Sequence, residues 1–129
     1  MHKRVLICDD SLMTRQLVSE ALSEDGWEIV GEAADGREAV DLYKRLKPDA
    51  VTLDLVMSNV DGLTALDQII ALDSQAQVVV VSSVSRPDVI AECVRKGAQD
   101  FVAKPFTNEQ LQQAMANCVV DMPDACPTS

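Results

Sequence analysis

Five polar side chains follow short apolar runs in this chain, and their types could do chemistry together. Three are carboxylates, which would repel one another at one site unless a cation or protons neutralise them. Ligands that are all oxygen favour a hard ion, so we expect Mg²⁺ there, with Mn²⁺ as the alternative. The five are Asp9, Asp10, Asp54, Ser82 and Lys104.

Metal binding alone does not account for the lysine and the serine of this set. Lys104 brings a fixed positive charge and Ser82 a hydroxyl donor, which are typical ligands of a phosphate. A metal ion and an ammonium group together neutralise a phosphoryl group in transfer, so a nearby carboxylate can act as its acceptor. We expect Asp54 to be that acceptor, because its strand should lie between the acidic pair and the Ser82 and Lys104 side. The five residues therefore predict a phosphorylation switch.

The apolar runs that precede these residues predict buried strands. Each run holds about four apolar, largely β-branched residues, and a stretch with helical spacing follows each one. This alternation predicts an α/β fold of five βα units, a doubly wound parallel sheet whose strands all end at one edge. One strand is less apolar and should lie at the side of the sheet. The expected strands are 3–8, 28–33 (the side strand), 50–53, 77–82 and 100–103.

Apolar residues at helical spacing predict which helix faces are buried. After Val120 the pattern stops, so we expect one domain over residues 1–120 and a flexible tail over 121–129. Methionines are typical fillers of irregular gaps in a core, and Met13 is expected to be one. The faces of the first and fourth helices are expected to include Leu17, Val18, Ala21 and Leu22, and Ile90, Cys93 and Val94.

Composition limits the classes of function. The formal net charge of −10 opposes direct binding to nucleic acid. No apolar run approaches the length that spans a membrane, and we expect a cytoplasmic protein. The cysteines show no metal or redox spacing, so Cys8, Cys93 and Cys118 are expected to be buried free thiols.

Several motifs together resemble a known family. The motifs are Val5-Leu6-Ile7-Cys8-Asp9-Asp10-Ser11, Asp54 with Met57 and Asp61-Gly62, Ser82, and Lys104-Pro105-Phe106. With them, the chain resembles the receiver domain of bacterial two-component response regulators from about Lys3 to Val120. The first and last motifs, together with Gly31-Glu32-Ala33-Ala34-Asp35-Gly36-Arg37-Glu38-Ala39-Val40, are most similar to single-domain chemotaxis regulators of the CheY type.

The resemblance implies a fold and a set of ligands. The fold would be a flavodoxin-like three-layer sandwich with the parallel strands in the order 2-1-3-4-5. Asp10 and Asp54 would bind Mg²⁺ directly, Asp9 would act mainly through water, and Val56 would add its backbone carbonyl. Lys104 would pair with the phosphoryl oxygens.

The resemblance also implies a mode of signalling. The hydroxyl of Ser82 would turn inward to the phosphate, and Phe101 would rotate into the space that the moving loop leaves. The fourth helix, fifth strand and fifth helix would form the face that partners recognise. The expected partners are a CheA-like histidine kinase and the flagellar motor switch, and the protein is expected to be a monomer. It would catalyse only its own Mg²⁺-dependent phosphorylation and dephosphorylation, so we do not expect an enzyme.

Four alternatives remain open. A phosphohydrolase with an aspartyl nucleophile would ordinarily need a second acid where Val56 stands. A flavodoxin-like cofactor binder would need a neutral loop where Asp9 and Asp10 would repel a bound phosphate. The chain could also be the receiver part of a larger regulator, such as a methylesterase or a transcription factor, or it could serve as a phosphate sink.

Overall fold

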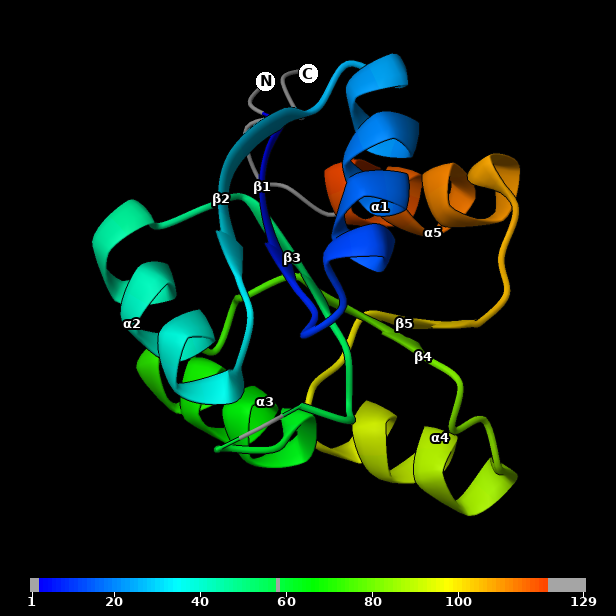
Figure 1. Cartoon of the computed structure of the whole chain (residues 1–129). Helices are drawn as coiled ribbons and strands as arrows, with labels where there is room; N and C mark the ends of the chain where they lie inside the picture. The colour runs from blue at the N-terminus through cyan, green and yellow to red at the C-terminus, as the bar shows by residue number, and fades with distance from the viewer. Residues whose placement is uncertain (1–2, 58, 121–129) are drawn as a thin grey trace.

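Five strands alternate with five helices over the part of the chain that the structure describes (Figure 1). The structure is a computed structural model that describes residues 3–57 and 59–120. The strands are β1 (Arg4–Cys8), β2 (Glu28–Ala33), β3 (Ala50–Leu53), β4 (Val78–Ser82) and β5 (Asp100–Ala103). The helices are α1 (Leu12–Glu24), α2 (Gly36–Leu46), α3 (Gly62–Leu72), α4 (Pro87–Arg95) and α5 (Asn108–Val120).

The strands form one parallel sheet in the order β2-β1-β3-β4-β5. Helices α1 and α5 cover one face of this sheet, and α2, α3 and α4 cover the other (Figure 1). The predicted three-layer, doubly wound fold is therefore confirmed, with β2 at the side of the sheet. The predicted strands are also confirmed, and β1 and β4 each begin one residue later than expected.

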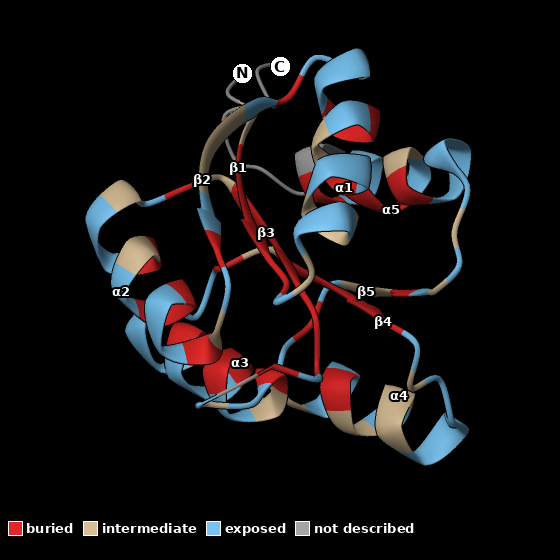
Figure 2. Ribbon diagram, in the orientation of Figure 1, coloured by how far each residue is buried: buried red, intermediate tan, exposed pale blue. Residues whose placement is uncertain are grey.

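Two hydrophobic cores, one on each face, hold the layers together. Because successive side chains of a strand point to opposite faces, Val5 and Ile7 of β1 enter the core under α1 and α5. Leu6 and Cys8 enter the core under α2, α3 and α4. All of β4 is buried, as the red central strands of Figure 2 show. The middle of the sheet is thus a rigid base for residues at the strand ends.

Side chains cap three of the helices that start at the carboxyl edge of the sheet, α1, α2 and α3. Ser11 accepts a hydrogen bond from the backbone amide of Thr14 at the start of α1. Asp35 and Asp61 act in the same way at the starts of α2 and α3. Such caps satisfy amide groups that have no partner within the helix, so each turn from strand to helix is well defined.

Three residues that were predicted to lie in the core are exposed, so these predictions are wrong. Leu17 is 51%, Val94 57% and Met13 71% exposed. A helix that packs on a sheet buries only a narrow stripe, which in α1 is Val18, Ala21 and Leu22. The apolar residues beside that stripe therefore face outward, although their spacing alone would also fit the buried face.

The remaining predictions on the fold have mixed outcomes. Cys8, Cys93 and Cys118 are buried free thiols, as expected. The tail expected at 121–129 lies outside the described residues and stays a prediction. Among the helices of the described chain, none has the length and apolar character needed to cross a membrane.

Candidate functional site

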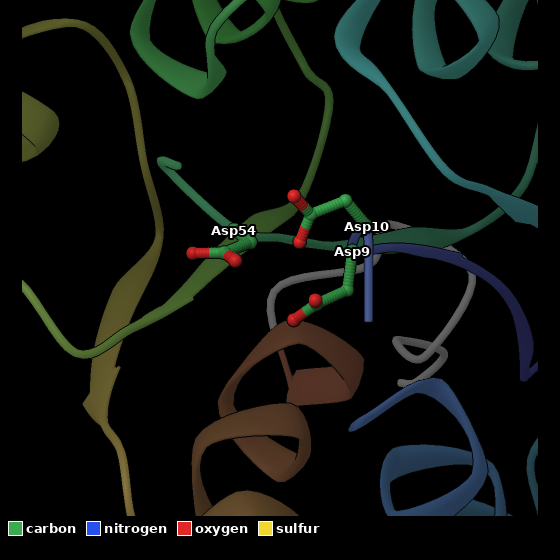
Figure 3. Close-up of side chains that lie close together, drawn as sticks. All are labelled: Asp9, Asp10 and Asp54. Carbon is green, nitrogen blue, oxygen red and sulfur yellow. The ribbon is translucent and has the colours of Figure 1, made fainter. Parts of the chain in front are cut away.

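Three carboxylates meet at the carboxyl edge of the sheet (Figure 3). Asp9 and Asp10 follow β1, and Asp54 follows β3. The pairing of Cys8 with Leu53 aligns the two strand ends, and the amide of Asp54 donates to the carbonyl of Cys8 at 2.9 Å. One oxygen atom from each carboxylate lies within 4.8 Å of those of the others. The chain thus gathers three carboxylates in one small volume.

Lys104 brings the opposite charge to this cluster. It follows β5, and its Nζ lies 2.8 Å from Oδ2 of Asp9 and 3.2 Å from Oδ2 of Asp54. Asp9 is only 3% and Asp54 5% exposed, whereas Asp10 is exposed. One ammonium group therefore bridges the two buried carboxylates and leaves Asp10 facing solvent.

The charge balance of the cluster is incomplete. Burial raises the pKa of Asp54, the negative charge of Asp9 raises it further, and Lys104 opposes both effects only in part. Burial alone would lower the pKa of Lys104, but its hydrogen bond to Asp9 and the charge of Asp54 outweigh that effect and raise it. The ammonium form is thus favoured, while the ionised form of Asp54 is disfavoured until more positive charge arrives.

The donor atoms of the cluster suit a hard divalent cation. Asp9 uses Oδ1 to accept from the amide of Ser11 at 2.9 Å, and Asp54 uses Oδ1 to accept from the amide of Val56 at 3.3 Å. These bonds hold both carboxylates in place. Three neighbouring carboxylates, two of them held by hydrogen bonds, with a shortage of positive charge are the environment that Mg²⁺ or Mn²⁺ would fit.

Ser82 and Phe101 lie on the neighbouring strands. Ser82 ends β4, is fully buried, and its Oγ accepts from the amide of Val84 at 3.1 Å. The amide of Lys104 donates to the carbonyl of Ser82 at 3.0 Å, so the ends of β4 and β5 are tied together. Phe101 is half-buried on β5, packs against the core under α2, α3 and α4, and lines a cavity of about 520 Å³.

One residue beside the cluster was missed from the sequence. Arg15 of α1 donates through Nη1 to the backbone carbonyl of Asp9 at 2.7 Å, and its Nε pairs with Glu32 of β2 at 2.9 Å. A signal was present, because a cation near the start of a helix opposes the helix dipole. An arginine at that position therefore suggests a specific partner nearby.

Known proteins are similar to this chain in both sequence and fold. A model of the family described as response regulator receiver domain matches residues 5–116. The chain is 39% identical over 115 residues to the chemotaxis protein CheY of Thermotoga maritima, which covers 89% of this chain and 96% of that protein.

Two solved structures extend the likeness. A chain in the crystal structure of the CheX-CheY-BeF3-Mg+2 complex from Borrelia burgdorferi has a TM-score of 0.89 at 35% identity, covering 92% of this chain and 90% of that one. The response regulator domain of Thermotoga maritima CheB has a TM-score of 0.83 at 32% identity, covering 95% and 100%.

The family match covers all five strands except the first residue of β1, and all buried residues of the two cores except Cys118. It favours a receiver over the phosphohydrolase and over the flavodoxin-like cofactor binder that the sequence left open. The chain belongs to the response regulator receiver domain family and is closely related to the CheY chemotaxis regulators.

Proposed function

We propose that this chain is a phosphorylation-activated switch of a two-component system, in which Asp54 accepts the phosphoryl group of a histidine kinase. The observation that carries the proposal is the position of Asp54. It is buried, it lies beside two further carboxylates, and it is bridged to Asp9 by the ammonium group of Lys104. Burying a carboxylate beside others costs free energy, and groups in such environments cluster at functional sites.

The transfer step needs little covalent chemistry from the protein. An oxygen of the Asp54 carboxylate forms a bond to phosphorus while the bond from phosphorus to the donor's imidazole nitrogen breaks, and the imidazole keeps that electron pair. Lys104 is placed to move from the carboxylates to the phosphoryl oxygens, where it offsets their charge. The product is an aspartyl phosphate.

The carboxylates of Asp9, Asp10 and Asp54 would hold Mg²⁺, and the backbone carbonyl of Val56 would complete the protein ligands. When bound, the cation offsets negative charge on the phosphoryl oxygens. The similar chain of Borrelia burgdorferi comes from a complex that contains BeF3 and Mg²⁺. That likeness supports the assignment of Mg²⁺ as the cofactor here.

The output would be a changed surface. Ser82 would exchange its bond with the amide of Val84 for one with the phosphoryl group, and Phe101 would move with the loop after β4. The face formed by α4, β5 and α5 would then bind a target. A CheA-like kinase and the flagellar motor switch are the partners that we propose, because the relatives are chemotaxis proteins. A CheX-like partner is a third candidate, because the complex from Borrelia burgdorferi contains CheX.

Intact mass after incubation with acetyl phosphate tests the phosphorylation step. We expect an added mass of one phosphoryl group with Mg²⁺ and none with EDTA. Asp54→Asn should abolish the adduct, whereas Asp41→Asn, a matched change at an exposed position of α2, should leave it intact. An adduct that persists in Asp54→Asn would refute Asp54 as the acceptor.

A further inference from the structure

Arg15 connects three parts of the molecule beside the acidic cluster. It extends from the first turns of α1, its side chain is only 15% exposed, and it contacts both the turn after β1 and the side strand β2. Its Nη1 donates to the backbone carbonyl of Asp9, and its Nε donates to the carboxylate of Glu32. The guanidinium group of Arg15 therefore contacts other groups of the protein and is largely shielded from solvent.

The turn after β1 must direct both Asp9 and Asp10 to the same site. Successive residues of a strand point to opposite sides, so Asp9 and Asp10 can serve one site only if the chain leaves the strand geometry between them. Further hydrogen bonds hold this turn besides that of Arg15. The amide of Asp9 donates to the carbonyl of Ala33 and the amide of Ser11 to the Asp9 carboxylate, both at 2.9 Å, and Lys104 donates to the same carboxylate at 2.8 Å. The bond from Arg15 is the one that fixes the Asp9 carbonyl.

The bond from Arg15 is also of the strong kind. A hydrogen bond from a charged donor is shorter and stronger than one between neutral groups, and its length of 2.7 Å fits that class. The dipole of α1 disfavours a cation at this end of the helix, and Glu32 offsets that effect through its ion pair. The ion pair and the hydrogen bond thus stabilise the positive charge of Arg15 at a helix end where the dipole alone would disfavour it.

We propose that Arg15, held by Glu32, is a positioning residue that fixes the Asp9–Asp10 turn in the conformation that binds the divalent cation. The inference rests on the proposed function, because it concerns the same metal site. Arg15 touches neither the cation nor the phosphoryl group and acts through the main chain of Asp9. Loss of such supporting contacts typically lowers metal affinity by roughly ten- to a hundredfold.

Calorimetric titration of Mg²⁺ into the unphosphorylated protein tests this inference without any measurement of activity. Arg15→Met keeps most of the aliphatic stem but removes the donors, and we expect it to raise the Kd for Mg²⁺ roughly tenfold. Glu32→Gln should give a smaller rise in the same direction, because Arg15 keeps its bond to Asp9 but loses its anchor.

The matched control is Lys96→Met. Lys96 forms an ion pair with Asp67 at 2.8 Å, is similarly part-buried, and links α3 to α4 without any contact to the cluster. Its loss should lower stability by about as much as that of Arg15 and leave the Kd unchanged. Urea unfolding of each variant without metal separates stability from affinity, and the titrations are made where every variant is folded.

The outcomes separate the inference from the function on which it rests. A Kd about tenfold weaker in Arg15→Met and unchanged in Lys96→Met, at equal stability of the two variants, supports the positioning role. A Kd of Arg15→Met within about twofold of that of the unmodified protein would show that Arg15 forms only an ordinary ion pair. This result would overturn the inference and leave the proposed function standing. If the unmodified protein itself takes up no Mg²⁺, both the metal site and the role of Arg15 fail.

Discussion

Among the individual residues of the acidic cluster, Asp54 lies in an environment that opposes its charged form. Burial and the charge of Asp9 raise its pKa, and Lys104 compensates only in part. We therefore expect Asp54→Asn to stabilise the metal-free protein at neutral pH, because the amide has no charge to bury. Urea unfolding in EDTA measures this difference in the free energy of unfolding.

The pH dependence follows from the direction of the shift. Since the pKa of Asp54 is higher in the folded than in the unfolded state, its protonated form favours folding and its ionised form opposes it. The advantage of Asp54→Asn should be absent below about pH 4, grow as the pH rises through the pKa of the folded state, and then stay constant. Asp41→Asn, a matched change at an exposed position of α2, is the control. If the unmodified protein were the more stable at pH 7, the attraction of Lys104 would outweigh burial.

The site residues that could be predicted are those whose position follows from a strand end. Asp54 and Lys104 come directly after apolar runs, and parallel strands bring those ends together. Arg15 could not be assigned in this way, because its two partners lie on other elements. Its role depends on how α1 packs beside β2, which no local pattern contains.

For the helices and strands, what could be predicted depends on how much of each element is buried. The central strands are buried on both faces, so their apolar runs have one interpretation. The helices are half exposed, and their apolar residues need not all lie inward. Leu17 and Val94 were misplaced for this reason, because each lies next to the buried stripe of its helix.

The close contact between two loops at the site gives a prediction for α2. Gly36 begins this helix, and a Cβ atom there would lie 2.0 Å from the backbone oxygen of Val60 in the loop before α3. Since backbone cannot yield as a flexible side chain can, we expect Gly36→Ala to lower the free energy of unfolding by roughly 2 kcal/mol. Urea unfolding measures the loss.

A matched alanine substitution separates this clash from a general effect on α2. Asp41 is exposed on the same helix, so Asp41→Ala should change the free energy of unfolding by less than about 0.5 kcal/mol. Asn59 donates to Asp35 at 2.7 Å and links the same two loops. If Gly36→Ala were as harmless as Asp41→Ala, the two loops would be able to separate without cost, and this contact would not define the shape of the site.

Across the molecule, the sheet provides a short route from the acidic cluster to the α4–β5–α5 face. The last residue of β4, Ser82, pairs with Ala103 of β5, and the amide of Lys104 donates to the Ser82 carbonyl. Phe101 pairs with Val80 two residues earlier on the same strands. A change at Ser82 therefore reaches β5 directly, without passing through a helix.

This route predicts that the response of the face depends on the hydroxyl of Ser82. In nuclear magnetic resonance spectra, BeF3⁻ with Mg²⁺ should shift the backbone signals of the unmodified protein both near Asp54 and near Phe101. Ser82→Ala keeps the carboxylates and Lys104, so it should still bind the phosphate mimic, and the shifts near Asp54 should remain. The shifts near Phe101 should be largely lost, because the bond that draws the loop after β4 inward is missing. Equal shifts near Phe101 in both proteins would show that the signal reaches this face by another path, with Lys104 at the end of β5 as the next candidate.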